Sequence, residues 1–418
     1  MIHPAMSRLA SSVRGVSRLS WDLLTRDSLP IEEEGVLYDC RLTAARRRNL
    51  ALQMINHRHL GYRLPALPHL LHIGVTTYCN LSCPACPTGN KALGRPAQHL
   101  DFDLYRRTID ELRDVLMLML FWDWGEPLMH PRVAEMIEYA SRHDIMSLIS
   151  TNGTVANSER QLESLVAAQP RVLIVCVDGV DQATHEKYRT GGGLNKVLDT
   201  ARRLVKIRER LKVAYPAIEF RTLANRENEA QLPDLLRMAQ DVGADMFSLK
   251  SLCPHDFAGT SVDDQLVPVK SNLSRYVYAS ESPAQARRLD FVRRGALTCA
   301  KPHRCPNIYS NGDLGFCCFS GTPLEVFGSL TTQSFRSLWG SAFARDLRVR
   351  FAAQGGSASC WTCYHRTAHK PIVLFRVPLR PIPPRLTIQC PTTAEEFLRA
   401  VAPAQAPATE KQTASAPS

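Results

Sequence analysis

The sequence predicts an α/β protein whose core is a partial (βα)6 barrel, followed by a small C-terminal cysteine-rich β-hairpin/helix extension. Two observations predict the barrel. Short apolar runs alternate with segments of helical periodicity, and about six such units follow one another before the alternation stops near residue 255. Strands that alternate with helices form parallel sheets with right-handed crossovers. Six units suit an open or partial barrel better than a closed barrel of eight.

The individual elements follow from the same periodicity. Strands are expected at 69–79, 116–124, 145–153, 171–179, 217–225 and 245–252. Helices are expected at 102–115, 131–143, 158–168, 193–210 and 227–243. In such sheets the ligand binds at the carboxyl ends of the strands. The residues that follow each strand are therefore the place to look for a site.

The chain divides into five regions by composition and pattern. They are a basic helical N-terminal region at 1–65 with its best helix at 41–60, the barrel core at 66–255, a polar connecting region at 256–298, the cysteine-rich extension at 299–370, and a Pro-rich, disordered tail at 371–418.

Composition limits the cellular setting and the partners. The 418 residues include thirteen cysteines and carry a net charge of +11. No apolar run approaches the ~20 residues of a membrane span, and the basic N-terminus lacks the apolar core of a secretory signal. Metal-binding thiols in a reducing, cytoplasmic setting are expected. The positive charge is spread out, so no nucleic-acid partner is expected, and packing of the N-terminal helix on the barrel is favoured over contact with a membrane surface.

Three cysteines follow the first expected strand, in the stretch CNLSCPAC: Cys79, Cys83 and Cys86. Thiolates suit zinc or iron–sulfur clusters, and structural zinc normally takes four protein ligands. Three thiolates on a cubane cluster leave one iron open for another ligand. The missing fourth cysteine therefore points to catalysis, and a zinc site completed by a distant ligand such as His72 is the alternative.

This spacing resembles that of the radical S-adenosylmethionine (radical SAM) superfamily, in which Cys-x3-Cys-x2-Cys follows the first strand of a partial (βα)6 barrel. Ala85 stands where the family usually has an aromatic residue. WGEPLMHP at 124–131 resembles the family's Gly-Gly-Glu-Pro motif, with Trp124 in place of the first glycine. STNGT at 150–154 resembles the polar end of its third strand. VDGVDQATHEKYR at 177–189 resembles the Asp-Gly and Tyr-Arg segment after its fourth.

The resemblance implies a 4Fe–4S cluster that binds S-adenosylmethionine and cleaves it reductively to a 5′-deoxyadenosyl radical, which abstracts hydrogen from a substrate. Cys79, Cys83 and Cys86 would hold this cluster, and a flavodoxin- or ferredoxin-type protein would reduce it. The residues expected to bind S-adenosylmethionine are Gly125, Glu126, Pro127, Thr151, Asn152, Asp178 and Arg221.

Some of these assignments have alternatives. Glu126 could be a simple turn residue, Arg221 could be an ordinary ion-pair residue, and Asp178 could face the substrate instead. Asp123 and Lys250, near strand ends, are candidates for substrate contact.

A second cysteine group lies in CAKPHRCPNIYSNGDLGFCC at 299–318 and in CWTC at 360–363. The NG pair predicts a hairpin with a two-residue turn. The pattern resembles the SPASM or twitch extension of radical SAM enzymes, which implies one auxiliary 4Fe–4S cluster here, and a zinc ribbon is the alternative. The favoured ligands are Cys299, Cys317, Cys360 and Cys363, with Cys305 and Cys318 as alternatives; Cys40, Cys176 and Cys253 are expected to be ordinary buried thiols.

The predicted reaction is oxidation or dehydrogenation of a small-molecule or sugar-like substrate. An auxiliary cluster can accept the electron left after hydrogen abstraction, and the N-terminal region lacks the strand pattern of a peptide-recognition domain. The alternatives are a maturase that modifies a ribosomally made peptide or protein residue, a sulfur or methyl transferase, and a non-catalytic iron–sulfur or zinc protein.

Overall fold

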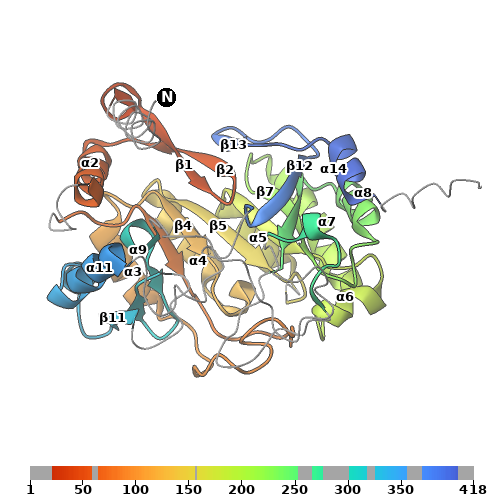
Figure 1. Ribbon diagram of the computed structural model, residues 1–418, viewed down its shortest axis with the longest axis horizontal. Coiled ribbons are helices and arrows are strands. Elements are labelled where there is room, and N and C mark those ends of the chain that lie inside the picture. Colours follow the sequence, from red (N-terminus) through yellow and green to blue (C-terminus); the bar gives the residue numbers. More distant parts are fainter. Residues whose placement is uncertain are drawn as a thin grey trace, which may run out of the picture.

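The computed structural model describes residues 21–58, 65–155, 158–252, 266–275, 301–317, 325–354 and 370–402. Its centre is a ten-stranded sheet in which six parallel strands lie side by side in chain order (Figure 1). The six are β3 (Leu70–Ile73), β4 (Leu118–Phe121), β5 (Met146–Thr151), β6 (Val172–Cys176), β7 (Ala217–Ala224) and β8 (Met246–Ser251). The predicted α/β fold with a mostly parallel sheet is confirmed.

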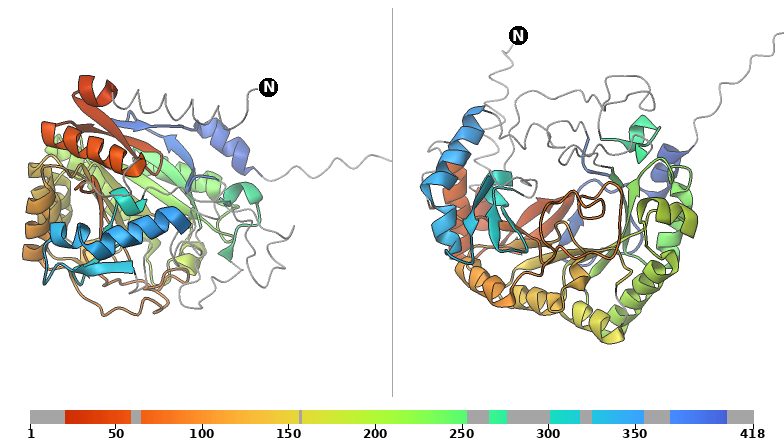
Figure 2. Two further views of the ribbon diagram at one scale, coloured as in Figure 1. Left: turned by 60° about the vertical axis from the view of Figure 1, so that its left-hand side comes forward. Right: turned by 90° about the horizontal axis from the view of Figure 1, so that it is seen from below.

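Helices cover the outer face of this sheet, in an arc that Figure 2 shows from below. They are α3 (Phe102–Leu112), α4 (Val133–Arg142), α5 (Glu159–Ala167), α6 (Gln182–Tyr188), α7 (Leu194–Leu211) and α8 (Leu232–Asp241). All but α6 bury one apolar stripe; in α3 the stripe includes Leu104, Ile109 and Leu112, and the Asp101 side chain caps the first turn. Helix α8 begins later than expected, because Pro233 suits only the first turn of a helix.

The C-terminal extension lengthens the sheet beyond β3. Strand β9 (Asn307–Ile308) lies parallel to β3, and β10 (Asp313–Gly315) and β11 (Val326–Ser329) follow antiparallel. The hairpin at the NG pair is present, but its loop has three residues, since Tyr309 and Asp313 still pair and Gly312 alone in this loop has a positive φ, +84°. The described part of the extension also contains three helices: α9 (Lys301–Arg304), α10 (Phe335–Trp339) and α11 (Ala342–Gln354).

An N-terminal hairpin covers the amino-terminal half of the inner face of the parallel sheet. Strands β1 (Ser28–Glu33) and β2 (Val36–Arg41) are joined by Glu34 and Gly35, both at positive φ. Apolar residues of this hairpin share one buried cluster with the inner residues of β3 to β6. The expected all-helical N-terminal region is therefore wrong for 28–41, where alternating apolar residues form strands, although α2 (Ala44–Arg58) falls within the helix expected at 41–60.

Arg46 fastens α2 to the barrel. Its guanidinium is 2% exposed and donates to the backbone carbonyls of Arg41 and Leu116, each at 2.9 Å. It also pairs with the Asp144 carboxylate at 3.0 Å. One side chain thereby joins the N-terminal region to the end of α4 and the start of β4.

The folded chain also extends further toward the C-terminus than expected. Strand β12 (Val373–Pro378) pairs antiparallel with β8, β13 (Leu386–Ile388) pairs with β2, and α14 (Ala394–Val401) begins with a Thr393–Glu396 capping box. The disordered tail predicted from residue 371 is therefore wrong up to 402, because apolar segments between the prolines still find a sheet edge. The part of that prediction that covers 403–418 lies outside the described residues.

The tip of the N-terminal hairpin carries two carboxylates into the inner side of the barrel. Glu34 pairs with Arg221 at 2.7 Å and with Lys250 at 3.2 Å, and Glu33 pairs with Lys301 at 2.6 Å. Burial alone would raise the pKa of Glu34, but Arg221, Lys250 and Arg376 together hold it well below its usual range. The hairpin is thus anchored by charge at its tip and by apolar contact along its length.

We expect Glu34→Gln to lower the free energy of unfolding by about 3 kcal/mol at neutral pH, because Arg221 loses a carboxylate in a buried setting. The folded-state pKa of Glu34 lies below its unfolded value of about 4.3. Stabilisation by this carboxylate is therefore present above that value and is lost as the pH falls toward the folded-state pKa. The difference in urea-unfolding midpoint between the wild type and Glu34→Gln should be largest at neutral pH and should shrink below about pH 4.

Glu32→Gln is the matched control in the same hairpin. Glu32 is exposed and accepts the Gly35 amide at 2.8 Å, which a glutamine oxygen also does. An equal loss in both variants, or a Glu34→Gln difference that does not change with pH, would show that the ion pairs do not hold the hairpin.

Candidate functional site

A cavity of about 330 Å³ lies at the carboxyl ends of the parallel strands, between these ends and the tip of the N-terminal hairpin. Cys79, Cys83 and Cys86 all line it. Six of the seven residues predicted to bind S-adenosylmethionine also line it: Gly125, Glu126, Pro127, Thr151, Asn152 and Arg221. The structure therefore brings the separate sequence motifs to one place.

The three cysteines lie in a loop that leaves the sheet after β3. Strand β3 ends at Ile73, earlier than expected, and the chain then crosses the end of the sheet, where Thr76 bridges to His99. Within the loop the Cys86 amide donates to the Cys83 carbonyl at 3.1 Å. A Cβ at Gly89 would lie 2.5 Å from the backbone nitrogen and oxygen of Cys83, so only glycine allows this close turn.

Gly125 lets the second motif pack against this loop. A Cβ at Gly125 would lie 2.1 Å from the Thr76 carbonyl oxygen. The next amide, that of Glu126, donates to the Tyr78 carbonyl at 2.8 Å. The glycine of the WGEP sequence is thus required by a backbone approach, and it holds the motif directly beside Cys79.

The Glu126 carboxylate joins the ends of two strands. It accepts hydrogen bonds from the Leu128 amide (3.0 Å), the Thr151 hydroxyl (2.8 Å) and the Asn152 amide (2.7 Å). Burial raises the pKa of Glu126, and these three donors oppose the rise. Glu126 therefore does more than the simple turn residue that the sequence left open, since it fixes the ends of β4 and β5 beside the cavity.

Asn152 connects the end of β5 to the loop that contains Cys79, Cys83 and Cys86. Its side-chain amide donates to the Asn80 oxygen at 2.9 Å, and Asn80 in turn donates to the Thr154 hydroxyl at 2.8 Å. Asn80 directly follows Cys79. The position of the first cysteine is thereby coupled to the polar end of β5.

Asp178 does not line the cavity, contrary to the expectation that it faces S-adenosylmethionine or substrate. It is fully buried, and its carboxylate accepts from the Leu223 amide at 2.6 Å and from Arg189 Nε at 2.5 Å. Arg189 lines the cavity instead, and the proximity of Asp178 raises its pKa against the lowering effect of burial. The segment 177–189 therefore presents the Arg189 guanidinium, and not the Asp178 carboxylate, to the cavity.

Arg221 lines the cavity but is already neutralised. Besides Glu34, it pairs with Glu219 on its own strand at 2.7 Å. The structure thus places Arg221 in an ion-pair network, which is the alternative that its sequence position left open.

The donor set suits an iron–sulfur cluster better than a single ion. Within the described ranges, no three His, Cys, Asp or Glu side chains converge closely enough to hold one metal ion, so the alternative zinc site with His72 is not assembled. A cubane binds each thiolate through a different iron and so needs its cysteines further apart. Burial raises the pKa of Cys83 to about 12 and that of Cys79 in the same direction, so binding a metal cluster would release thiol protons.

The second cysteine group is only partly described. Cys299, Cys318, Cys360 and Cys363 lie outside the described residues. Cys317 follows β10 and is half-buried.

Cys305, an alternative ligand, is fully buried in the apolar cluster under the hairpin, where burial raises its pKa to about 11. This environment is that of a core thiol. Cys299 lies outside the described residues, so the choice between Cys299 and Cys305 as a cluster ligand stays a prediction.

Sequence reasoning missed several charged groups of the cavity. Glu33, Glu34 and Lys301 line it from the hairpin tip and from α9, and the ion pairs that bring them there join distant parts of the chain. Asp123 and Lys250, predicted as substrate contacts, do line the cavity. The sequence signal that could have revealed Glu33 and Glu34 is the alternation of apolar residues around the Glu34–Gly35 turn. This alternation predicts a hairpin, but it does not predict where on the sheet the hairpin docks.

Two sequence families match the chain. Residues 73–239 match the family described as the radical SAM superfamily, and residues 299–364 match SPASM, described as an iron–sulfur cluster-binding domain. Together the two segments make up more than half of the chain. Radical SAM domains bind a 4Fe–4S cluster and S-adenosylmethionine, and SPASM domains bind auxiliary iron–sulfur clusters.

Relatives with a named activity share about a quarter of their residues with this chain. An AdoMet-dependent heme synthase of Methanosarcina barkeri is 26% identical over 70% of this chain and 88% of that protein. A PqqA peptide cyclase of Gluconobacter oxydans is 27% identical over 43% of this chain, and the match spans about half (48%) of the cyclase.

The fold is likewise similar to that of a solved structure. SuiB of Streptococcus suis, bound to S-adenosylmethionine, superposes with a TM-score of 0.52 at 14% identity, over 78% of this chain and 89% of SuiB. None of the helices in the described part of the chain has both the length and the hydropathy needed to cross a bilayer. On the two family matches, and on the cavity that gathers the radical SAM motifs, the chain belongs to the radical SAM superfamily and carries a C-terminal SPASM domain.

Proposed function

We propose that this chain is a radical SAM oxidase, which removes a hydrogen atom and then a proton and an electron from a small polar substrate. The observation that carries the proposal is the convergence of three elements on one cavity at the carboxyl ends of the strands. These elements are the three thiols, the Glu126 framework and the carboxyl group of Asp123. A cytoplasmic setting and a flavodoxin- or ferredoxin-type electron donor are part of the proposal.

Cys79, Cys83 and Cys86 would hold the radical SAM cluster. When bound, the cluster and S-adenosylmethionine supply a 5′-deoxyadenosyl radical, and the auxiliary cluster supplies an electron acceptor. The chain contributes position and a dry environment. Arg189 suits the carboxylate of S-adenosylmethionine better than Arg221 does, because Asp178 engages Arg189 through Nε, whereas two carboxylates already surround Arg221.

Asp123 is the carboxyl group best placed to accept the substrate proton. Of the four carboxyl groups that line the cavity, Glu33 and Glu34 are engaged by short ion pairs and Glu126 by three hydrogen bonds. The side chain of Asp123 is 4% exposed and lies 3.6 Å from Arg95, whose guanidinium also stacks on Tyr309.

The protonation of Asp123 fits this role. Burial raises its pKa to about 7, and the lowering effects of Arg95 and of hydrogen bonds from Asn307 and the Trp124 backbone do not cancel this rise. A base is most effective when its pKa lies near the working pH. In the proposed oxidation the substrate C–H bond loses a hydrogen atom, the resulting radical loses a proton to Asp123, and its remaining electron leaves to the acceptor.

We expect Cys83→Ala to abolish formation of 5′-deoxyadenosine. The anaerobically reconstituted wild type should hold about eight irons per chain, four in each of two clusters, and the variant about four fewer. Iron analysis and chromatography after addition of dithionite and S-adenosylmethionine measure both quantities.

Cys390→Ala is the control for this substitution, because Cys390 is an exposed thiol outside the cavity. It should keep the wild-type iron content and activity. Zinc in place of iron, or a fully loaded wild type that forms no 5′-deoxyadenosine, would contradict the proposed function.

We expect Asp123→Asn to lower the amount of oxidised product per 5′-deoxyadenosine about 100-fold, because the substrate radical then lacks its proton acceptor. In the wild type, product formation should rise with pH around the pKa of about 7, since the deprotonated carboxylate is the active form. The variant should lose this rise. Asp103→Asn is the control, because Asp103 is an exposed carboxylate on α3. An unchanged pH profile in Asp123→Asn would exclude Asp123 as the base.

A maturase that modifies a peptide is the second candidate. The structure removes the sequence argument against it, because the N-terminal region does contain strands, which form a three-stranded sheet with β13. Relatives named as a PqqA peptide cyclase and as a subtilosin biosynthesis protein also support it. The apolar face of the hairpin, however, is buried against the barrel, which favours the small substrate. Stimulation of S-adenosylmethionine cleavage by the peptide fraction of a cell extract, and not by its small-molecule fraction, would favour the maturase.

A further inference from the structure

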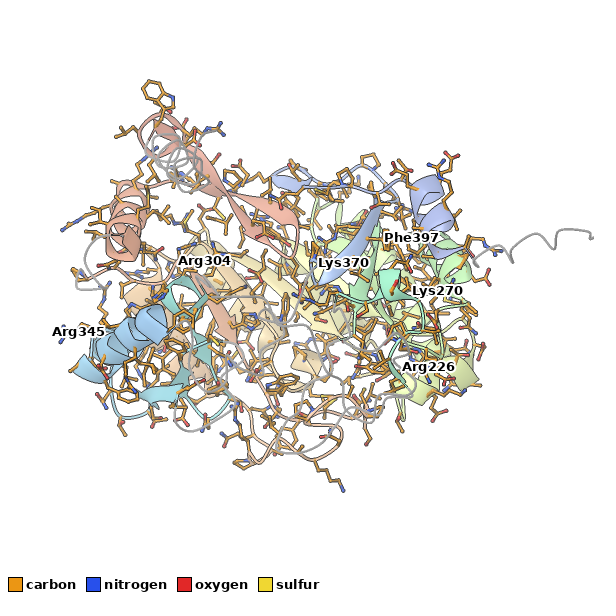
Figure 3. All side chains as sticks on the ribbon, viewed as in Figure 1. Arg226, Lys270, Arg304, Arg345, Lys370 and Phe397 are labelled. Atoms are coloured by element: carbon orange, nitrogen blue, oxygen red, sulfur yellow. The ribbon has the colours of Figure 1, made fainter. Side chains whose placement is uncertain are left out.

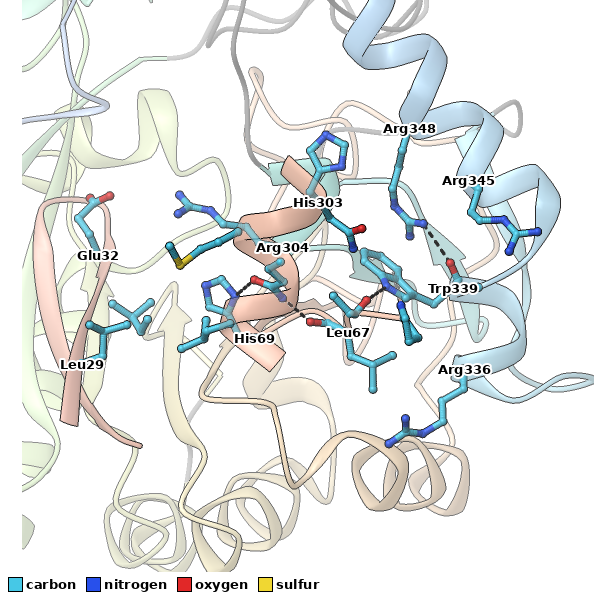
Figure 4. Close-up of a pocket in the computed structure, with 18 of the residues that line it drawn as sticks. Leu29, Glu32, Leu67, His69, His303, Arg304, Arg336, Trp339, Arg345 and Arg348 are labelled. Carbon is cyan, nitrogen blue, oxygen red and sulfur yellow. Dashed lines mark hydrogen bonds between the residues drawn. The ribbon is translucent and has the colours of Figure 1, made fainter. Parts of the chain in front are cut away.

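A second cavity lies outside the cluster site, between the N-terminal hairpin, α2 and the helices of the C-terminal extension. Its volume is about 730 Å³. Figure 4 shows the side chains that surround it. Ligand sites typically fall between about 300 and 1,000 Å³. The cavity is therefore large enough for an organic molecule, and the cluster chemistry described above does not use it.

The charges that line this cavity are predominantly positive. Arg304, Arg336, Arg345 and Arg348 line it, and Glu32 is the single carboxylate among its lining residues. The Glu32 carboxylate accepts the Gly35 amide within its own hairpin. An uncharged occupant would leave this excess of arginine without a counterion.

Two of the four arginines are occupied by the protein itself. Arg348 stacks on the Trp339 ring at 3.7 Å and donates to the Trp339 carbonyl at 3.0 Å. Arg336 donates to the Glu111 carbonyl at 2.8 Å. These two side chains form walls of the cavity.

The other two arginines have guanidinium groups that the described chain does not pair. Nε of Arg304 is buried without a hydrogen-bond partner, and within the described residues neither Arg304 nor Arg345 has an ion pair. Arg345 is exposed on α11, and both lie on the α2 and α11 side of the molecule in Figure 3, away from Lys270 and Lys370. Arg304 is thus the group inside the cavity that needs an anion, and Arg345 adds positive charge at its mouth.

The remaining lining is largely apolar. Leu29 of β1, Leu50 and Met54 of α2, and Leu67 line the cavity together with Trp339, whose indole N–H donates to the Ala66 carbonyl at 2.8 Å. This hydrogen bond fixes the ring as one rigid apolar wall.

His69 beside Arg304 is neutral, because burial and the nearby arginine lower its pKa to about 3. Arginine therefore supplies the positive charge at neutral pH.

We propose that this cavity binds an amphipathic organic carboxylate, with its apolar body against α2 and Trp339 and its carboxylate at Arg304. A guanidinium binds a carboxylate through paired, charge-assisted hydrogen bonds. Inorganic anions would satisfy the arginine but not the apolar walls, and neutral molecules would do the reverse.

The site shares its walls with the cluster cavity. Glu32 and Arg304 line the second cavity, and Glu33 and Lys301, on the same strand and the same short helix, line the cluster cavity, where they pair at 2.6 Å. An occupant at Arg304 therefore contacts the strand and the helix that also form one side of the reaction cavity. This places the proposed ligand outside the reaction cavity but beside two of its walls.

The test uses 8-anilinonaphthalene-1-sulfonate, a fluorescent anion with an apolar body, on the full reconstituted chain. We expect saturable binding that decanoate displaces and inorganic phosphate does not. Arg304→Gln should weaken both the probe and decanoate about tenfold, because the charge-assisted contact is lost. Met54→Asp, which keeps every arginine but puts a carboxylate in the apolar wall, should weaken decanoate similarly.

Arg350→Gln is the matched control, since Arg350 lies on the same helix as Arg345, is exposed and already pairs with Asp346 at 2.9 Å. It should bind like the wild type. Equal affinity in Arg304→Gln and wild type, or displacement by phosphate as effective as that by decanoate, would overturn the proposal. The measurement needs no radical chemistry, so its failure is distinct from failure of the proposed oxidase.

Discussion

The need to cover both faces of a parallel sheet determines this architecture. Parallel strands are buried on both sides, and their exposed apolar residues must find a partner layer. Helices α3 to α8 cover the outer face, and the β1–β2 hairpin covers the amino-terminal half of the inner face. Among the described residues, the carboxyl-terminal half of this face borders the reaction cavity. Polar and thiol groups line it, so the position of the hairpin decides where the reaction cavity lies.

The way the hairpin is anchored also decides which charges are available for chemistry. Glu34 and Glu33 neutralise Arg221, Lys250 and Lys301, which would otherwise place several cations together in a buried space. Burial of paired charges is tolerable only when every partner is satisfied. Arg221 is thereby occupied, and Arg189 and Asp123 remain as the cation and the carboxyl group that face the cavity with weaker or partial engagement.

Local pattern was sufficient for the barrel and for most of its site. Apolar periodicity located the six parallel strands, although β3 is shorter than expected because its end leaves the sheet to form the cysteine loop. The WGEP and STNG motifs could be recognised from their residue types. Gly125 packs on the backbone of Thr76, and the Glu126 carboxylate accepts the Asn152 amide of the STNG motif. The hairpin and β12 were missed although both carry strand-favouring apolar residues, and the places where these strands dock depend on tertiary packing that the local pattern does not contain. The partners of Arg221 and the burial of Cys305 depend on those missed elements.

The two cavities are physically linked through the same hairpin. Arg304 and Lys301 lie on one short helix, and Lys301 is held by Glu33, which follows Glu32 on β1. A change in the docking of the hairpin would therefore alter both cavities together. A ligand between α2 and the hairpin would oppose such a change, because it adds contacts that exist only when the hairpin is docked. A ligand that holds the hairpin in place would also preserve the pairing of Glu34 with Arg221. The charge balance of the reaction cavity therefore depends on contacts made outside it.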